Sequence, residues 1–154
     1  TVPAIVVRIP MVLGENDYAS RALRKKSGLV FDIRSSSQEQ PIYAGDVIEA
    51  MVQAMTITES GIIELAGPES LTRASLIRRA AGIAGKHAVV ISLPLAMGML
   101  IAKLLEWCLP VPPVTRDMLG ILDHDDDIDA TKAGTRLGIY LTSLDDTLRK
   151  VVSS

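Results

Sequence analysis

The sequence has few aromatic residues and a single cysteine, and both shortages exclude classes of protein. Aromatic residues make up 3% of the 154 residues, and the formal net charge is -2. A nucleic-acid-binding face needs clustered cations and stacking rings, so we expect no nucleic acid as a partner. Because Cys108 stands alone, no internal disulfide can form. This fits a reducing compartment, and we expect a cytoplasmic location.

The chain also lacks a recognisable signal peptide and a transmembrane segment. Residues 1–10 show no basic region followed by an apolar stretch and a small-residue cleavage site. The most apolar run, residues 93–105, is interrupted by Lys103 and is too short to cross a bilayer. Apolar residues nevertheless make up 48% of the sequence. The chain can therefore bury a core built from aliphatic and methionine side chains.

Strands and helices are predicted to alternate, which indicates a helix-rich α/β fold with few, short strands. Residues 4–9 form a β-branched run typical of a strand in a parallel sheet. The other expected strands or extended segments lie at residues 29–33, 41–44, 62–65 and 88–92. Helical spacing predicts helices at residues 17–26, 45–55, 72–84, 94–107, 115–122, 130–137 and 144–151.

Capping residues mark where these helices begin and end. Side chains that accept hydrogen bonds from a first helical turn are expected at Asn16 or Asp17, Asp46, Thr72, Asp129 and Ser143. Gly85 and Gly138 are expected to end helices. In the helix at 45–55, the apolar residues that share one face are Val47, Ala50, Met51, Ala54 and Met55.

Several short motifs occur in an order that points to one family. Residues 8–14 read R-I-P-M-V-L-G, residues 41–47 read P-I-Y-A-G-D-V, and residues 64–72 read E-L-A-G-P-E-S-L-T. They resemble R-P-x-x-V-Y-G, h-V-x-D-V-A and Y-x-L-A-G-P-E-x-L-T of the extended short-chain dehydrogenase/reductases, the NAD(P)-dependent sugar epimerase/dehydratase group. Residues 115–117 and 129–138 resemble its C-terminal helices, especially in the atypical branch with complex I subunit-like proteins.

The resemblance implies that the chain is the C-terminal, substrate-binding part of an NAD(P)-binding Rossmann-type protein. Residues 1–14 would be the last strand and turn of the Rossmann sheet. Residues 15–154 would form a single compact subdomain that binds a small-molecule substrate. An upstream Rossmann domain of the same chain would be its partner and would bind NAD or NADP. The family's proline after Arg8 is Ile9 here, and its tyrosine is Leu13.

The same resemblance selects candidate site residues. On the nicotinamide side of the cofactor it places Arg8, Pro10, Met11 and Val12. A buried strand and turn without a ligand is an equally open interpretation. In residues 34–40, family members often contact the substrate, and Arg34 would meet an anionic group there. An exposed, mobile surface loop is the favoured interpretation of that segment.

The residues that carry the family's chemistry have no counterpart in this sequence. A pyrophosphate-binding Gly-rich turn opens a helix, whereas Gly82 and Gly85 lie at the end of one, where the dipole disfavours anions. The family's catalytic tyrosine has a lysine four residues on, which Tyr18, Tyr43 and Tyr140 lack. We expect no catalytic residue and no cofactor on this chain alone. The alternative parent is a non-catalytic NAD(P)-binding scaffold or assembly protein.

The acidic run, the apolar helix with Cys108 at its end, and the first strand each lead to a further expectation. The acidic run at 123–129 fails the EF-hand pattern, because Ile128 and Gly134 occupy the glycine and glutamate positions, so no metal is expected. The helix at 94–107 is apolar nearly all round; core packing is the default, and a substrate pocket, a partner or a membrane surface are the alternatives. Cys108 is expected to pack as well. The strand at 4–9 is expected to lack its sheet neighbours, and its open edge predicts self-association.

Overall fold

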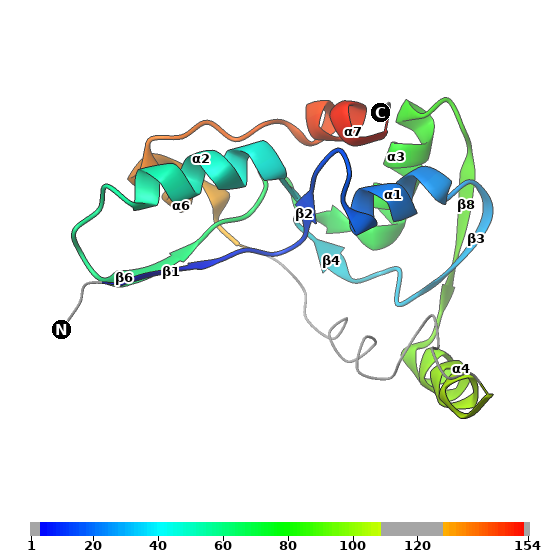
Figure 1. The fold of residues 1–154 in the computed structure, drawn as a ribbon. Coiled ribbons are helices and arrows are strands. Elements are labelled where there is room, and N and C mark those ends of the chain that lie inside the picture. Colours follow the sequence, from blue (N-terminus) through cyan, green and yellow to red (C-terminus); the bar gives the residue numbers. More distant parts are fainter. Residues whose placement is uncertain (1–3, 109–127, 153–154) are drawn as a thin grey trace.

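The computed structural model describes residues 4–108 and 128–152 (Figure 1). Its described strands form four separate pairs. The two longer pairs are parallel and consist of β1 (Ile5–Arg8) with β6 (Gly61–Glu64), and β3 (Gly28–Ile33) with β8 (Ala88–Leu93). The short pairs are β2 (Val12–Leu13) with β5 (Ile42–Tyr43), parallel, and β4 (Gln38–Glu39) with β7 (Leu71–Thr72), antiparallel. The fold is α/β and rich in helix, as the sequence predicts.

The described helices agree with the sequence in place and in most of their caps. They are α1 (Tyr18–Lys25), α2 (Ala44–Ala54), α3 (Arg73–Ile83), α4 (Leu95–Cys108), α6 (Ala130–Leu137) and α7 (Leu144–Val152). Four predicted N-caps accept backbone hydrogen bonds, namely Asp17, Thr72, Asp129 and Ser143. Gly85 and Gly138 follow helices with φ of 67° and 66°, a conformation that glycine adopts freely. The helix expected at 115–122 lies outside the described residues.

The first half of the fold, called here the β1–β6 unit, consists of β1 and β6 with α2 and α6 on one face of the pair (Figure 1). Ile5 and Val7 point towards these helices, whereas Val6 is 53% exposed on the opposite face. β1 keeps one neighbour from its own chain, so the expectation that it has none is wrong for that edge. Among residues 4–108 and 128–152, no strand pairs with its other edge.

The second half, the β3–β8 unit, contains β3 and β8 with α1, α3 and α7. One core cluster joins the three helices, and its fully buried members include Leu76, Leu148 and Val151. β8 contributes Val90 to this cluster. The outer face of the strand pair stays open, and its exposed side chains are Leu29, Phe31, Val89 and Ile91. β2 and β5 connect the two units.

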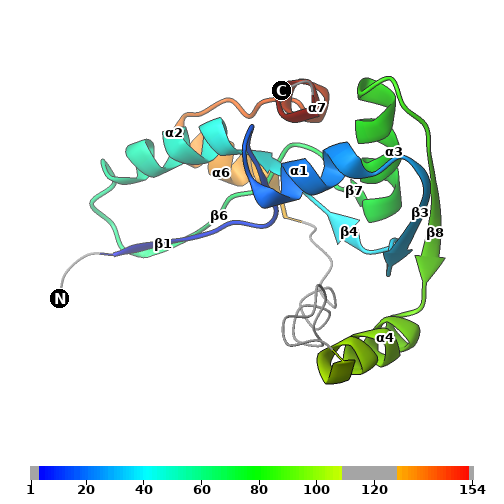
Figure 2. The ribbon, with the colours of Figure 1, turned by 45° about the vertical axis from the view of Figure 1, so that its right-hand side comes forward.

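α4 lies apart from the other helices, beyond the ends of β3 and β8 (Figure 2). It contacts β3 at Gly98, where an added Cβ would lie 2.8 Å from the Ile33 side chain, and Ala102 on the same helix is fully buried. Leu100 and Trp107 are 59% and 86% exposed, so core packing is wrong for these side chains. Cys108 is exposed too, contrary to expectation. No described helix is long and apolar enough to cross a membrane.

Candidate functional site

The candidate site begins at the carboxyl ends of β1 and β6, the edge at which parallel sheets commonly bind ligands. Arg8 and Glu64 end the two strands in register. Their side chains form an ion pair with 3.6 Å between Nη1 and Oε1, and are 64% and 56% exposed. An open hollow of about 610 Å³ adjoins this pair, and α6 adds Asp129, Lys132 and Arg136 to its lining. Arg8 is therefore within reach of a ligand.

Residues 10–12 carry the chain from the β1–β6 unit to the β3–β8 unit. The Met11 carbonyl accepts a hydrogen bond from the Ile42 amide at 2.9 Å, and Val12 pairs with Ile42 in the β2–β5 ladder. Val12 packs on the first core cluster. Met11 instead lines a second hollow, which lies between α1 and α3. Of the residues selected by sequence, Arg8 and Met11 therefore each line a hollow, and Val12 is a packing residue.

The hollow beside Met11 measures about 190 Å³ and has mainly apolar walls. α1 supplies Tyr18, Ala19, Ala22 and Leu23, and α3 supplies Leu76 and Ile77. Two cations complete the lining, Lys26 and Arg73. A cavity of this kind suits a small group that is apolar except at one polar end.

The two cations belong to an ion cluster that sequence reasoning missed. Lys26 Nζ lies 2.5 Å from Asp32 Oδ1, and Arg73 Nε lies 3.0 Å from Asp32 Oδ2. Arg73 Nη1 also contacts Glu39 Oε1 at 2.9 Å. Asp32 and Glu39 are each 8% exposed. Two cations thus balance two buried carboxylates, a geometry in which loss of one partner leaves an uncompensated charge.

The polar segment at 34–40 is not the exposed loop that its composition predicts. Ser35, Ser37, Glu39 and Gln40 are all buried. The carbonyls of Ser35 and Ser37 accept hydrogen bonds from the Ala74 and Arg73 amides at 2.8 and 2.9 Å. The segment therefore satisfies backbone donors in the first turn of α3, which keeps it packed against that helix.

Arg34 occupies the turn that follows β3. Its φ is +52°, and its amide donates to the Leu93 carbonyl at 3.0 Å. A positive φ at a residue other than glycine is uncommon. Arg34 lines neither the Arg8 hollow nor the Met11 hollow. The structure thus separates Arg34 from the other residues that the resemblance selected.

Gln40 is a second residue that sequence reasoning missed. Its Nε2 donates to the carbonyls of Gly67 at 2.9 Å and Ile128 at 2.7 Å, and its Oε1 accepts from the Ile128 amide at 2.8 Å. A Cβ on Gly67 would lie 1.9 Å from the Pro41 carbonyl oxygen, so only glycine fits there. Gln40 thereby fixes the backbone of Ile128, a residue that precedes α6 and lines the Arg8 hollow.

The N-cap role expected for Asp46 is wrong. Tyr43 is the N-cap of α2 and makes no side-chain cap bond. Asp46 instead lies in the first turn and accepts two hydrogen bonds from Thr142. The Thr142 amide donates to Oδ2 and the Thr142 hydroxyl donates to Oδ1, each at 2.7 Å. Its charge still lies near the positive end of the helix dipole. Asp46 therefore anchors the segment between α6 and α7.

Tyr43 contacts two charged groups from other segments. Its hydroxyl donates to Glu15 Oε1 at 2.7 Å, and Lys150 Nζ lies 4.1 Å from the ring centroid. The hydrogen bond to Glu15 raises the pKa of Tyr43 and lowers the pKa of Glu15. Tyr43 thus links the start of α2 to the turn before α1 and to α7.

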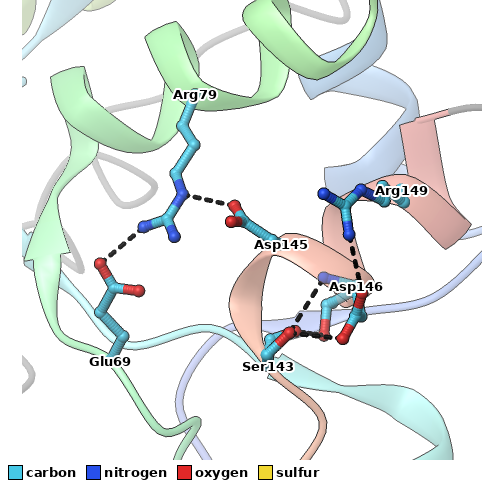
Figure 3. A network of polar contacts seen from close by, with 7 residues as sticks. Glu69, Arg79, Ser143, Asp145, Asp146 and Arg149 are labelled. Carbon is cyan, nitrogen blue, oxygen red and sulfur yellow. Dashed lines mark hydrogen bonds and ion pairs between the residues drawn. The ribbon is translucent and has the colours of Figure 1, made fainter.

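A polar network joins α3, α7 and the turn before β7 (Figure 3). Arg79 donates to Glu69 at 2.6 Å and to Asp145 at 2.7 Å. Arg79 lowers the pKa of Asp145, whose carboxylate accepts its hydrogen bond. Beside it, Asp146 accepts from Ser143 and pairs with Arg149 at 3.0 Å. The network fastens α7 to α3 and lies apart from both hollows.

The part of the chain that the structure describes contains no candidate metal site. Residues 4–108 and 128–152 contain no cluster of three His, Cys, Asp or Glu side chains suited to a metal ion. Residues 123–127 of the acidic run lie outside these ranges. Asp129, which ends the run, caps α6 through a 3.1 Å hydrogen bond from the Thr131 amide. Asp129 therefore acts as the predicted N-cap.

The chain is similar to several solved protein structures. No protein-family model and no curated protein sequence matches the chain. The match to a human epimerase family protein solved with NADPH covers 99% of this chain and 49% of the human chain, with TM-score 0.71 and 20% identity. A nucleoside-diphosphate-sugar epimerase from Pseudomonas aeruginosa matches 98% and 47%, with TM-score 0.69 and 24% identity. UDP-glucose 4-epimerase from Thermotoga maritima, solved with UDP-glucose, matches 97% and 44%, with TM-score 0.64 and 20% identity.

These likenesses establish the fold. The chain has the architecture of one part of the NAD(P)-dependent epimerase and dehydratase structures, and it spans about half the length of the structures that it matches. This agrees with the α/β, Rossmann-related fold predicted from the motifs.

Proposed function

We propose that the chain is the substrate-binding half of an NAD(P)-dependent protein of the epimerase/dehydratase type. In this proposal, an upstream Rossmann half binds NAD or NADP and carries the catalytic groups. The 154 residues bind and orient a small-molecule substrate. The reaction is hydride transfer to or from a carbon that bears oxygen, and nucleotide sugars are the first substrates to test. The proposal keeps the cytoplasmic location, on the basis of the single cysteine.

One observation carries this proposal: Arg8 and Met11, only three residues apart, line hollows on the two sides of the same crossing between units. Arg8 ends a strand of the parallel pair, at the edge where a cofactor in the crevice would lie. Met11 contributes to the small hollow that ends on Lys26 and Arg73. A substrate held between them would span the cofactor edge and the β3–β8 unit.

In this arrangement the residues of the chain have distinct roles. The Arg8 guanidinium would exchange its exposed partner Glu64 for an anionic ligand group, because an exposed ion pair is weak. The apolar walls of the Met11 hollow would exclude water from the bound group. The buried Asp32 and Glu39 would hold Arg73 in place at the end of that hollow.

The test is a fluorescence titration of NADH and NADPH, once with these 154 residues alone and once with the longer protein that we propose. We expect no binding to the chain alone and micromolar binding to the longer protein. Binding of equal strength in both experiments would contradict the division into halves. No binding in either would contradict the NAD(P) assignment. UDP-glucose is the first substrate probe, and Arg8→Met should weaken its binding in the longer protein.

A further inference from the structure

The outer face of the β3–β8 strand pair is apolar and open to solvent. Its exposed side chains are Leu29, Phe31, Val89 and Ile91, at 60%, 59%, 62% and 39%. Leu29 lies in register with Val89, and Phe31 with Ile91, so the four form two adjacent cross-strand pairs. The alternate residue Val90 points the other way and packs on the helices. A contiguous exposed patch of this kind typically marks a binding surface.

This outer face lies at the end of the molecule far from β1 (Figure 1). α1 and α3 lie on the inner side of the strand pair, between it and the β1–β6 unit. In the proposed function, the upstream half would continue the sheet from β1 and would leave the outer face of β3 and β8 uncovered. The exposure of this face is therefore independent of the proposed function.

Positive charge is concentrated in the elements around this face. Residues 18–36 span α1 and β3, and residues 73–103 span α3, β8 and the first part of α4. Together they contain ten of the 16 Lys and Arg residues but only one of the 18 Asp and Glu residues. That one acid, Asp32, is buried between Lys26 and Arg73. A chain with formal net charge -2 thus carries a cationic region, which attracts anionic partners.

Two exposed lysines stand beside the apolar face. α1 ends at Lys25, just before β3 begins, and Lys86 precedes β8 by two residues. Because β3 and β8 are parallel, both lysines lie at the same end of the strand pair. Lys86 Nζ donates to the Arg24 carbonyl at 3.4 Å, which brings the two segments together. The apolar face is thus bordered by cations where its strands begin.

We propose that the outer face of β3 and β8 binds the surface of a bilayer that contains anionic phospholipid. The four exposed apolar side chains would enter the boundary between the headgroups and the acyl chains. Lys25 and Lys86 would contact the lipid phosphates, because a lysine stem can lie along an apolar surface while its amine reaches a polar group. Apolar burial and electrostatic attraction together hold peripheral proteins on anionic membranes.

Other occupants fit this surface less well. Two copies of the chain packed face to face would bring their lysines together, and like charges repel. A nucleic acid would meet a single aromatic ring, Phe31, and no cation at the centre of the face. Anchor residues of protein interfaces typically fill pockets, whereas the four side chains line neither hollow of the candidate site. A bilayer needs no pocket, because its fluid acyl chains adapt to the side chains that enter them.

Co-sedimentation of the 154-residue chain with vesicles tests the proposal. We expect binding to vesicles of equal parts phosphatidylserine and phosphatidylcholine, weakened by salt, and much less binding to phosphatidylcholine alone. Phe31→Glu should weaken binding to the anionic vesicles by about tenfold or more, because it removes an inserted ring and adds a negative charge. The matched control is Tyr140→Glu, since Tyr140 is also an exposed ring, at 94%, and the change in charge is the same. It should change binding little.

The electrostatic contribution has its own pair of variants. Lys25→Gln combined with Lys86→Gln should weaken binding to the anionic vesicles by about tenfold or more, because each cation close to anionic lipid strengthens binding several-fold. Lys132→Gln combined with Lys150→Gln is the control, since it removes the same charge from α6 and α7. All four lysines are exposed or partly exposed at the surface, and circular dichroism checks that each variant is folded.

The longer protein of the proposed function should bind the anionic vesicles too, with the same dependence on Phe31. Absence of binding to vesicles, or loss of binding in the longer protein, overturns the proposal. So does equal binding to both kinds of vesicle, or an effect of either control as large as that of its matched variant. Binding to polyglutamate without binding to vesicles would assign the face to an acidic protein, and would overturn the membrane proposal as well.

Discussion

The two units of the molecule use the same plan and are held together differently. Each consists of a parallel strand pair with helices on one face. In the β1–β6 unit, polar residues fasten the backbone: Gln40 holds Ile128 and Gly67, and Asp46 holds Thr142. In the β3–β8 unit, charged side chains bind one another through Arg73 and Arg79. The comparison shows that two similar strand–helix layers can be held together by different polar contacts, side chain to backbone in one unit and ion pairs in the other.

The difference arises from the kind of chain segment that meets in each unit. Around the β1–β6 unit, irregular segments far apart in the sequence meet, and their buried backbone groups need partners. Around the β3–β8 unit, helices meet along their sides, where backbone groups are already paired, so long side chains form many of the contacts there. Mutations in each unit can show whether the two units are also separate in stability.

The largest effect should come from core truncation. Leu148→Ala in the β3–β8 unit and Leu65→Ala in the β1–β6 unit both remove a side chain that is 0% exposed. Each should lower the free energy of unfolding by about 2–5 kcal/mol. If the chain unfolds as one body, circular dichroism and local hydrogen exchange will report the same loss for both variants. A loss confined to the mutated unit would show that the units unfold separately.

The next effect should come from the ion cluster of the β3–β8 unit. Arg73→Met leaves Asp32 and Glu39 without their shared cation, and should cost about 2–3 kcal/mol, somewhat below a fully buried pair because Arg73 is partly exposed. Urea unfolding measures the loss. Arg78→Met, on the same helix but exposed, is the control and should change little. Equal losses in both variants would mean that the cluster contributes nothing.

A smaller effect is expected from the Gln40 clamp. Gln40→Leu introduces an apolar side chain of similar size and leaves the buried Gly67 carbonyl and the partly buried Ile128 backbone without their partner, at a cost of about 1–2 kcal/mol. The Ile128 amide should exchange faster by more than global stability explains. Gln53→Leu, at an exposed position of α2, is the control. Unchanged exchange at Ile128 would show that Gln40 does not hold this segment.

The smallest effect should be the pH dependence of the Arg79–Asp145 contact. Because Arg79 lowers the pKa of Asp145 in the folded state, the pair stabilises the fold above the ordinary carboxyl pKa of about 4. This contribution should disappear as the pH falls through the lowered pKa. The difference in urea midpoint between the wild type and Asp145→Asn should therefore be present at pH 7 and vanish at low pH. A difference that persists in strong acid would assign it to packing.

Much of the fold was predictable because it depends on local patterns. Caps such as Thr72 and stops such as Gly138 act within one turn of a helix, so sequence neighbours determine them. The Gln40 clamp could not be found, because its partner Ile128 is 88 residues away. The buried segment at 34–40 was misjudged for a related reason. Its polar side chains suggested exposure, but its carbonyls satisfy α3.

The candidate site was predictable only in part. The motif led to Arg8 and Met11, which both line hollows. Periodicity could not reveal that Lys26 and Arg73 meet at one of them, because their contact depends on how α1 and α3 pack. The resemblance placed Arg34 with the substrate; Arg34 lies in the turn after β3 and lines neither hollow, and its contact with a substrate stays a prediction. Asp46 lies in the first turn of α2, two residues after its start, and bonds to the distant Thr142 where capping was expected.

The small-residue contact of α4 has a consequence for how this helix can change. Gly98 lies against Ile33 and Ala102 is buried, while Met97, Leu100, Leu104 and Trp107 are exposed. Attachment and surface chemistry are thus divided between different residues of the same helix. The outward residues can vary in polarity without loosening the helix, whereas a single methyl group added at Gly98 would push against Ile33. Mutation can therefore change the surface residues of α4 without changing the position of the helix.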